Sequence, residues 1–333
     1  MNIPKKMWAA VQHSKGSELH FEEVDVPQPG AGEVLVKMAY APINPSDLSF
    51  LQGTYAIRPS YPVIPGIEGS GTVVAAGKGI LPKMRMGKKV SCTSTKGHGG
   101  SWAEYMVTSA MHVIPVGNME MEQAATMIVN PLTALSFIDI AKSGKHKAII
   151  NNAAGGALGR MISRLAQKEG IQCINIVRKK EQLRQLKADG ALNVLNNTDE
   201  DYHDDFIDLN RRLKPTLILD PVGGPRAQSL LKHAPKGATL LFYANLSEQE
   251  ICLNPRVLVQ EEKALSGFYL ADYAAKKNIL KALSDSKKVQ RLIKHELKTT
   301  IQSQMFLDEL NEAIELYRNN MSAGKVLIQC KKK

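Results

Sequence analysis

The spacing of hydrophobic residues divides the chain into three stretches. Up to about residue 115, short apolar runs are separated by Pro and Gly, a pattern typical of strands and turns. The predicted strands are Trp8–His13, Leu19–Val24, Val34–Ala41, Gly71–Ala76, Lys89–Thr93 and Trp102–Val107. The first stretch is therefore predicted to be a β-rich unit.

From about residue 118 the apolar residues follow helical spacing, and helices then alternate with short apolar strands. Two helices, Met119–Val129 and Leu132–Ala141, are predicted on either side of Asn130–Pro131. The predicted strands are 147–151, 173–177, 192–195, 216–220, 238–243 and 264–269, and the helices between them are 158–169, 181–189, 205–213, 225–233 and 255–262. Such alternation predicts an α/β fold with a doubly wound parallel sheet.

The third stretch begins after residue 271. Helices near 273–294 and 306–320 precede one strand, Lys325–Cys330, which must pair with another strand. The parallel sheet already has its strands, so we expect this one to join the N-terminal β-rich part. The predicted domains are residues 1–118 with 272–333, and an inserted nucleotide-binding domain of residues 119–271.

A glycine-rich turn lies between the first predicted parallel strand and its helix. In the pattern G-x-G-x-x-G, which marks dinucleotide-binding turns, the first glycine is Ala154 and the others are Gly156 and Gly159. Gly155 and Gly156 are expected to turn the backbone tightly beside a pyrophosphate, and Gly159 to let the helix pack on the strand. The predicted contacts to the pyrophosphate are Gly155, Gly156, Ala157, Leu158 and Gly159.

The residues after the next strand predict which dinucleotide binds. A site for NAD usually has Asp or Glu there, on the ribose 2′-hydroxyl, whereas this chain has Arg178, Lys179 and Lys180. Cationic side chains attract a 2′-phosphate, so the sequence favours NADPH. The alternative is a basic cap before the next helix.

Composition narrows the class of protein further. The formal charge of +11 comes from Lys and Arg spread along 333 residues, without an aromatic-interleaved basic motif, so nucleic-acid binding is not expected. The chain has no uninterrupted apolar stretch long enough to cross a membrane, and MNIPKKMWAAVQ lacks an apolar signal core. A soluble cytoplasmic protein is therefore expected. Its four cysteines are widely spaced, which argues against a disulfide framework or a zinc lobe.

Ordered motifs along the chain resemble one family. They are AYAPINPSDLSFLQGTY (39–55), PVIPGIEGSGTVVAAG (62–77), GSWAEYMV (100–107), ATMIVNPLTAL (125–135), INIVRKK (174–180), DPVGG (220–224), LSGFYL (265–270) and AGKVLI (323–328). The chain resembles the medium-chain dehydrogenase/reductase superfamily, in its zinc-free NADPH-dependent branch of quinone oxidoreductases and mitochondrial-type 2-enoyl thioester reductases. The resemblance implies a GroES-like β-rich catalytic domain, a Rossmann nucleotide-binding domain and a homodimer.

The zinc-dependent branch of that superfamily differs at two positions. Its catalytic metal would need a Cys where Asn44 stands and a His where Ile67 stands, and the loop with four closely spaced Cys is also missing. No metal is therefore expected.

Catalytic residues follow from the same resemblance. Tyr55, in QGTY, matches a tyrosine that enoyl reductases use near the reacting carbonyl, and it is the candidate proton donor or enolate stabiliser. The alternative is an ordinary loop tyrosine. Asn44 is expected to hydrogen-bond the ribose or the substrate, and Asp47 to cap the short helix Leu48–Gln52.

Further cofactor contacts are implied position by position. They are Asn130 beside the nicotinamide, Tyr243, Ala244, Asn245, Leu246, Phe268, Tyr269 and Leu270 at two later strand ends, and Lys325 on the cofactor phosphates. The alternatives are core packing for Tyr243 and Phe268, and a solvated surface lysine for Lys325. Tyr269 stands where enoyl reductases often carry Trp, and Ala244 where Gly is usual, which leaves the substrate open.

The sequence thus predicts a reductase that transfers hydride from NADPH to a small conjugated carbonyl substrate, a 2-enoyl thioester or an enone. The alternatives are an NADPH:quinone oxidoreductase and a non-catalytic NADPH-binding sensor on the same fold.

Overall fold

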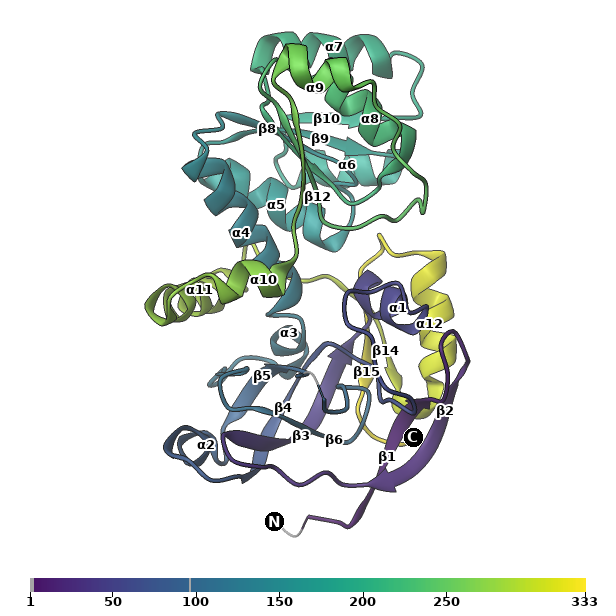
Figure 1. Cartoon of the computed structure of the whole chain (residues 1–333), viewed down its shortest axis with the longest axis vertical. Coiled ribbons are helices and arrows are strands. Elements are labelled where there is room, and N and C mark those ends of the chain that lie inside the picture. Colours follow the sequence, from purple (N-terminus) through teal and green to yellow (C-terminus); the bar gives the residue numbers. More distant parts are fainter. Residues whose placement is uncertain (1–2, 96) are drawn as a thin grey trace. The chain divides into compact units, whose positions relative to one another are not determined.

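A computed structural model describes residues 3–95 and 97–333. The chain forms two compact units, Met1–Val129 with Thr299–Lys333 (unit 1), and Asn130–Lys298 (unit 2). Unit 1 takes its residues from both ends of the chain, which is why purple, blue and yellow meet in it in Figure 1. Unit 2 is an insertion between them.

Unit 1 is built on a sheet that is antiparallel except for one parallel pair of strands. Seven strands form it, in the order β14-β15-β3-β4-β5-β7, with β6 also pairing with β3, and β1 and β2 form a separate hairpin. The strands are β1 (Lys6–Gln12), β2 (Leu19–Asp25), β3 (Glu33–Pro42), β4 (Glu68–Ala76), β5 (Lys89–Thr93), β6 (Tyr105–Ser109), β7 (Val113–Pro115), β14 (Ile301–Phe306) and β15 (Lys325–Gln329). The helical segments are α1 (Pro45–Leu51), α2 (Ile80–Arg85), α3 (Met121–Ala125), the 3₁₀ turn η1 (Leu307–Glu309) and α12 (Leu310–Asn319).

The C-terminal strand pairs where the sequence predicts. β15 runs antiparallel to β3, with Ile328 opposite Ala41, so the end of the chain completes the N-terminal sheet. β14 was not predicted, and it pairs with β15 in parallel. Its residues are only partly buried, which explains why no strong apolar run marks it.

Unit 2 contains a fully parallel sheet of six strands in the order β10-β9-β8-β11-β12-β13. The strands are β8 (Ala148–Asn151), β9 (Gln172–Val177), β10 (Asn193–Asn196), β11 (Leu217–Asp220), β12 (Thr239–Phe242) and β13 (Ala264–Gly267). The helices are α4 (Val129–Ser143), α5 (Ala157–Lys168), α6 (Lys180–Ala188), α7 (Tyr202–Leu213), α8 (Gly224–His233), α9 (Pro255–Glu261), α10 (Leu270–Ala275) and α11 (Ile279–Leu292). This is the strand order of a doubly wound dinucleotide-binding sheet.

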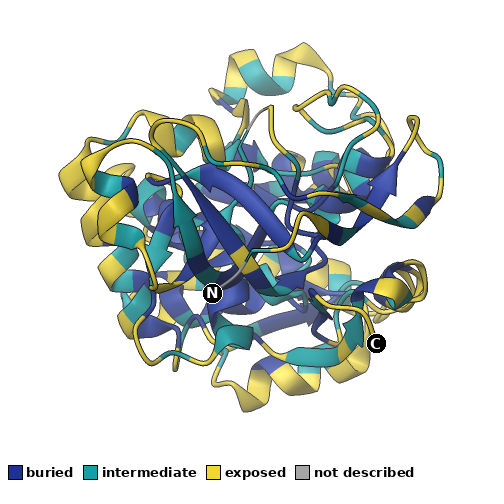
Figure 2. Ribbon diagram, turned by 90° about the horizontal axis from the view of Figure 1, so that it is seen from below, coloured by how far each residue is buried: buried dark blue, intermediate teal, exposed yellow. Residues whose placement is uncertain are grey.

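Burial follows the same plan. The central strands of both sheets are dark blue in Figure 2, and the outward faces of the helices are yellow. β8 and β11 are buried along their whole length, as expected for strands covered by helices on both faces. β13 differs, because all four of its residues are exposed and it forms an edge of the sheet.

The boundaries of the units differ from the predicted domain boundaries. Contacts place residues 272–298, which include α11, in unit 2 and not with the β-rich part. The reason is that α11 packs on helices of unit 2: Lys281 pairs with Asp139 of α4, and Lys288 with Glu169 after α5. Surface charge pairs of this kind leave no hydrophobic pattern in the sequence.

Two helix boundaries also differ. Asn130 and Pro131 lie in the first turn of α4 and do not separate two helices, since proline is tolerated there without a missing hydrogen bond. The single helix predicted near 273–294 is broken into α10 and α11, and Asn278 begins the second by accepting a hydrogen bond from the Lys281 amide (2.8 Å).

Candidate functional site

The candidate nucleotide site lies at the carboxyl edge of the parallel sheet in unit 2. Because all six strands run in parallel, the segments that follow them emerge at one edge. The glycine turn follows β8, Arg178 follows β9, Pro221 follows β11, Tyr243 follows β12 and Phe268 follows β13. The structure therefore brings the predicted cofactor residues of unit 2 to this edge.

The turn after β8 is shaped by alanines as well as glycines. Ala153 has a left-handed backbone (φ 53°), whereas Gly156 is extended (φ −75°). The Ala154 amide donates to the Ile176 carbonyl (2.9 Å), which ties the turn to β9. The tight bend predicted at Gly155 and Gly156 thus depends on Ala153.

The three glycines have different surroundings. A Cβ on Gly159 would lie 2.6 Å from the Ala154 Cα, so only glycine allows α5 to approach the strand this closely. The packing role predicted for Gly159 is confirmed. A Cβ on Gly155 would meet the Gln182 side chain at 2.6 Å, whereas one on Gly156 would meet only the Ala153 carbonyl oxygen, at 3.5 Å.

The start of α5 fits an anion. Gly156 is the N-cap and has no side chain to accept the free amides of the first turn, which are Ala157, Leu158 and Gly159. The open space over Gly156 lies at this helix start, where backbone N–H groups and the helix dipole favour negative charge. A pyrophosphate suits this place.

The three cations after β9 are available to a ligand. Arg178, Lys179 and Lys180 are exposed, and none forms an ion pair with any residue in 3–95 or 97–333. Lys179 is the N-cap of α6, and the Arg178 amide donates to Gln182 Oε1 (3.3 Å). Gln182 thus lies against both the glycine turn and the cationic segment.

Two buried side chains hold the neighbouring loops, and sequence reasoning did not select them. Asn152 Nδ2 donates to Asp220 Oδ1 (2.8 Å), and the Asp220 carboxylate also accepts the amides of Val222 (3.0 Å) and Gly223 (3.1 Å). Burial raises the pKa of Asp220 above its usual value, and these hydrogen bonds oppose the rise. In the sequence, Asp220 could have been found from the DPVGG stretch (220–224).

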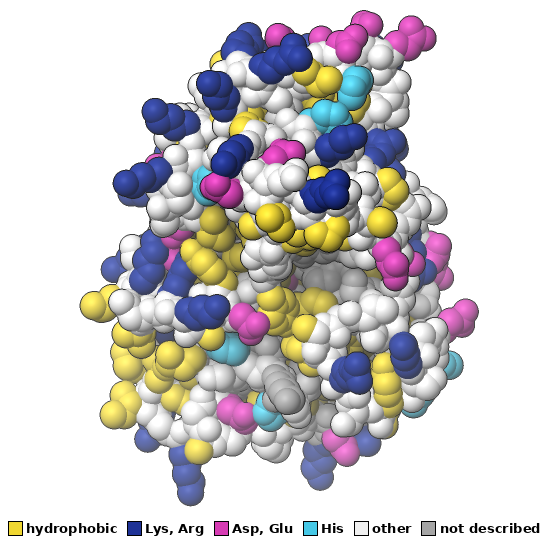
Figure 3. Space-filling view, turned by 45° about the horizontal axis from the view of Figure 1, so that its top comes forward, with side chains coloured by type: hydrophobic (Ala, Val, Ile, Leu, Met, Phe, Trp, Pro, Cys, Tyr) yellow, Lys and Arg dark blue, Asp and Glu magenta, His cyan; other side chains and the backbone are white. Residues whose placement is uncertain are grey.

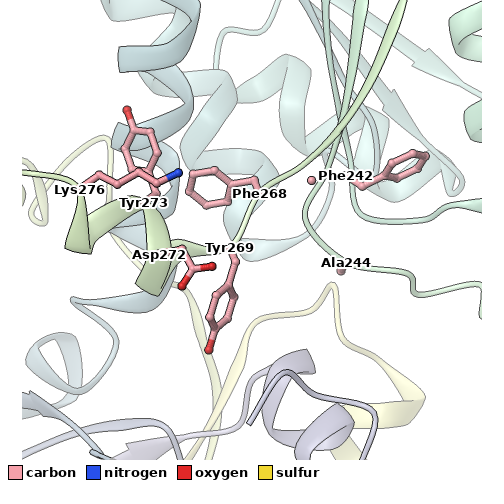
Figure 4. A pocket seen from close by; sticks show the side chains of 8 residues that line it. Phe242, Ala244, Phe268, Tyr269, Asp272, Tyr273 and Lys276 are labelled. Carbon is pink, nitrogen blue, oxygen red and sulfur yellow. The ribbon is translucent and has the colours of Figure 1, made fainter.

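A cavity of about 350 Å³ opens beside the ends of β12 and β13. Its lining, shown in Figure 4, is Phe242, Ala244, Gly267, Phe268, Tyr269, Asp272, Tyr273 and Lys276. Three of the predicted contacts, Ala244, Phe268 and Tyr269, therefore lie around one space. Its mixture of aromatic rings and a few polar groups is typical of a small-molecule pocket.

The remaining predicted contacts of unit 2 are less uniform. Tyr243 and Phe268 both pack on Phe137 of α4, with ring centroids 5.0 and 4.7 Å away. Burial, helped by the Asp220 charge, raises the pKa of the Tyr243 hydroxyl. Asn245 and Leu246 are exposed, Leu270 begins α10, and Asn130 is buried in the first turn of α4.

Unit 1 contains a buried polar cluster around Asn44. Its Nδ2 donates to Glu68 Oε1 (3.1 Å), and its Oδ1 accepts from the Lys325 ammonium. Lys325 is 1% exposed and also donates to the Ile43 carbonyl (3.0 Å). The solvated-lysine alternative is therefore wrong, and contact of Lys325 with cofactor phosphates stays a prediction.

Glu68 and Asp47 supply the negative charge of this cluster. Glu68 Oε2 accepts the amides of Ile128 (3.2 Å) and Val129 (2.9 Å), so it fixes the start of α4. Asp47 accepts the amides of Asn44 (2.8 Å) and Ile67 (3.0 Å). It therefore caps α1, as predicted, but from the third position of a helix that begins earlier than expected.

Burial of the cluster shifts the pKa values of its charged groups strongly toward their neutral forms. Burial raises the pKa of Asp47 to about 7 and that of Glu68 above its usual value, while it lowers the pKa of Lys325 to about 8. The attraction between the ammonium and the two carboxylates acts against each of these changes. Glu68 was missed by sequence reasoning, although it lies in the quoted PGIEGSG stretch.

Tyr55 lies beyond the other end of α1. It is half-buried, and its backbone amide donates to the Ser49 carbonyl (3.2 Å). Asn44 and Tyr55 thus flank the same short helix in unit 1, and the catalytic role of each stays a prediction.

Neither a metal site nor a membrane-spanning helix is found among residues 3–95 and 97–333. No group of three His, Cys, Asp or Glu side chains is placed to hold a metal ion there. Within the same residues, each helix is too short or too polar to span a bilayer.

Comparison with known families matches most of the chain. Residues 30–118 match the alcohol dehydrogenase GroES-like domain, and residues 157–285 match the family described as zinc-binding dehydrogenase. The two matches fall in unit 1 and unit 2, respectively.

Similar curated proteins are mitochondrial enoyl-[acyl-carrier-protein] reductases. The Xenopus tropicalis protein is 31% identical over 284 residues, which cover 83% of this chain and 79% of that protein. The Arabidopsis thaliana protein is 33% identical over 248 residues, which cover 72% of this chain and 65% of that protein.

Solved structures extend the similarity over the whole chain. A Mesorhizobium loti protein named for NADPH:quinone reductase activity is 31% identical, with a TM-score of 0.90 over 99% of this chain and 100% of that one. A quinone oxidoreductase from Thermus thermophilus shares the fold at 21% identity, with a TM-score of 0.81 over 97% and 100%. The chain belongs to the medium-chain dehydrogenase/reductase superfamily, in the branch of quinone oxidoreductases and mitochondrial-type enoyl thioester reductases.

Proposed function

We propose that the protein is an NADPH-dependent, zinc-independent reductase that transfers hydride to a conjugated carbonyl, either a 2-enoyl thioester or an enone. The observation that carries the proposal is the cationic segment Arg178–Lys180, exposed directly after β9 where an NAD-selective site has a carboxylate. The open helix start at Gly156 lies on the same sheet edge and suits the pyrophosphate.

The residues of the chain have separate roles in this proposal. The amides of Ala157 and Leu158 bind the pyrophosphate, and Arg178 with its neighbours binds the 2′-phosphate. NADPH supplies the hydride when it is bound. Tyr55 donates a proton or hydrogen-bonds the carbonyl oxygen as negative charge builds on it.

Zinc independence is supported by the contacts of Asn44. Asn44 stands at the position where the zinc enzymes need a Cys, and its side-chain oxygen already accepts a hydrogen bond from the Lys325 ammonium. A fixed cation there repels a metal ion, and the neighbouring Ile67 offers no ligand atom. We therefore expect full activity after treatment with EDTA or 1,10-phenanthroline.

A second candidate is an NADPH:quinone oxidoreductase. It is favoured by the Mesorhizobium loti structure, which matches 99% of this chain at 31% identity. A quinone accepts hydride without a proton donor at Tyr55, so the two candidates make different demands on that residue.

The test is a reductase assay on the purified protein. NADPH oxidation is followed with crotonyl-CoA, 2-alkenals and 1,2-naphthoquinone, and each reaction is repeated with NADH. Turnover of crotonyl-CoA or an alkenal with a preference for NADPH supports the first candidate, and turnover of the quinone alone supports the second. If NADPH binds but no acceptor oxidises it, the result supports the non-catalytic NADPH-binding sensor.

The partners expected are a small molecule and a second copy of the chain. Lys and Arg side chains are scattered among acidic ones over the face in Figure 3, without the continuous stripe of a nucleic-acid site. The edge strand β13, whose four residues are exposed, offers unpaired backbone groups to an identical strand. Sedimentation velocity of the wild type and of Leu265→Lys tests this homodimer. The cytoplasmic location of the protein remains a prediction.

A further inference from the structure

Unit 1 exposes hydrophobic side chains on and around the short helix α2. Ile80 and Met84 are one helical turn apart, so they share a face of the helix, and they are 82% and 59% exposed. Met86, directly after the helix, is 44% exposed, and Met111, between β6 and β7, is 61% exposed. These four residues form the α2 patch. Single exposed hydrophobic residues are ordinary, whereas a group of them marks a contact surface.

The α2 patch is held on a fixed backbone. Leu81, on the inner side of the helix, packs against the hydrophobic core of unit 1. The Gly32 amide donates to the Lys78 carbonyl before α2 (2.8 Å), and the Gly32 carbonyl accepts the Ala110 amide from the turn between β6 and β7 (2.9 Å). Gly32 therefore ties both parts of the patch into one corner of the unit, ready for contact without a folding step.

The charged residues in the segment that carries α2 are all cationic. Residues 78–89 contain no Asp or Glu, and their charged members are Lys78, Lys83, Arg85, Lys88 and Lys89. The four lysines are exposed and the arginine is half-buried. Within residues 3–95 and 97–333, none of the five forms an ion pair with a carboxylate. Unpaired cations around exposed hydrophobic residues complement a surface that is both anionic and apolar.

An anionic lipid bilayer has both of these properties. Its phosphate headgroups attract Lys and Arg, while apolar side chains enter the boundary between the headgroups and the acyl chains. Three of the four residues of the α2 patch are methionines, whose unbranched, flexible side chains adapt to irregular apolar surroundings. A protein partner would have to match the patch in shape as well, whereas a fluid lipid surface adapts to it.

We propose that the α2 patch docks the protein reversibly on anionic lipid bilayers. Four side chains are too few for permanent insertion, so the association is peripheral. In Figure 1, α2 lies on the opposite side of unit 1 from α1 and α12. A bilayer that contacts α2 therefore leaves uncovered the helix that Asn44 and Tyr55 flank. The docking does not depend on which substrate the proposed reductase uses.

The test is co-sedimentation of the full chain with lipid vesicles. We expect the wild type to bind vesicles of phosphatidylcholine and phosphatidylglycerol in equal amounts, and to bind pure phosphatidylcholine vesicles at least about tenfold more weakly. Raising KCl from about 0.1 M to about 1 M should weaken the binding, because salt screens exposed charges. Met84→Ser should lower the partition coefficient about tenfold by removing apolar contact, and Lys83→Glu about tenfold or more by reversing a charge. Both side chains are exposed, so both variants should keep the wild-type Tm.

Two variants on unit 2 are the matched controls. Leu192→Ser replaces a leucine that is 83% exposed, and Lys187→Glu makes the same charge change at the exposed end of α6. Both should bind the anionic vesicles as the wild type does. Losses in the controls as large as those in Met84→Ser and Lys83→Glu would overturn the inference, because overall hydrophobicity or net charge would then be responsible.

The behaviour of the wild type can overturn the inference in three further ways. Equal binding to both kinds of vesicle would exclude recognition of anionic lipid. No binding to either kind would leave an acidic protein as the occupant of the α2 patch. Self-association without vesicles that Met84→Ser abolishes would assign the patch to a second copy of the chain. Each of these results would leave the proposed reductase function intact, since the assay uses no substrate and no NADPH.

Discussion

The choice between NADPH and NADH depends on individual side chains after β9. Arg178→Glu replaces an attraction for the 2′-phosphate with a repulsion. We expect the binding free energy of NADPH to weaken by at least about 1.5–3 kcal/mol, because one charged hydrogen-bonded contact is worth this amount. The binding free energy of NADH should change little. Isothermal titration with both dinucleotides measures the difference. Lys187→Glu, at the exposed far end of α6, is the control for net charge, and equal losses for both dinucleotides would remove Arg178 from the phosphate site.

A single hydroxyl distinguishes the two candidate reactions. Tyr55→Phe removes the candidate proton donor and keeps the ring, so kcat with crotonyl-CoA should fall by about 100-fold or more, as when a general acid is lost. The dissociation constant of NADPH and the turnover of a quinone should stay unchanged. Tyr61→Phe, at another half-buried tyrosine of unit 1, is the control. Unchanged turnover of Tyr55→Phe on every accepted substrate would reject the role.

Lys325 makes the stability of the β-rich unit depend on pH. Asp47, with its pKa raised to about 7, and Glu68 are costly to bury ionised, and the Lys325 ammonium offsets that cost. Because the folded pKa of Asp47 exceeds its ordinary value of 3.8, its ionisation lowers stability as pH rises through the window from about 4 to 7. Lys325→Met removes the compensation where the carboxyls are ionised, and protonation restores neutrality at low pH.

We therefore expect Lys325→Met to lower the free energy of unfolding by about 3–5 kcal/mol at pH 7.5, and by clearly less at pH 5. Urea unfolding at both pH values measures the difference. Lys37→Met removes an exposed lysine of β3 and should have little effect at either pH. A loss for Lys325→Met that is the same at both pH values would show that packing, and not charge, is responsible.

The sequence predicted individual residues of the site more readily than the residues to which they are hydrogen-bonded. Asn44 and Lys325 were both selected from motifs, yet they are 281 positions apart and their contact exists only because β15 returns to β3. Glu68 was not selected, because a carboxylate in the glycine-rich stretch PGIEGSG looks like a loop residue until its three hydrogen bonds are known. Arg178 was predictable because its role depends only on its place after a strand.

At the level of elements, Gly156 and Gly159 of the same turn differ in the space around them, so replacing each with alanine should have a different effect. Gly159→Ala forces a Cβ against the Ala154 backbone at 2.6 Å, so α5 must move from β8. We expect it to lower stability by about 1–3 kcal/mol, as overpacking does. Gly156→Ala has no such clash and an ordinary backbone angle, so it should fold normally but bind NADPH more weakly. Thermal unfolding and titration of both variants measure this contrast, and a Gly156→Ala that binds as the wild type does would contradict the placement of the pyrophosphate.

The parallel sheet was the most predictable element, and the reason is physical. Strands covered by helices on both faces must be apolar throughout, and the helices between them keep one apolar face, so both periods are visible in the sequence. β14 and the break between α10 and α11 were missed because they depend on partial burial and on the Asn278 cap. Elements held by polar contacts leave a weaker pattern than elements held by a core.

At the level of the whole molecule, the chain leaves unit 1 at Val129 and returns to it at Thr299. Thr299 is anchored in unit 1 by Thr126 Oγ1 (2.9 Å) and by Gln123, so the outgoing and returning segments are joined there. Unit 2 therefore begins and ends at one place on unit 1, as an inserted domain does. Its sheet, its hydrophobic core around Ile150 and Ile218, the glycine turn and the cationic segment Arg178–Lys180 all lie within residues 130–298.

We accordingly expect residues 130–298 to fold when produced alone and to bind NADPH in preference to NADH. The fragment should not reduce any substrate, because Tyr55 belongs to unit 1. Near-ultraviolet circular dichroism reports its packing, and titration with both dinucleotides reports its selectivity. Arg178→Glu in the fragment should abolish the preference, as in the full chain. A well-packed fragment that binds the two dinucleotides equally would mean that the selectivity arises from residues outside unit 2, and the assignment of the cationic segment would have to be abandoned.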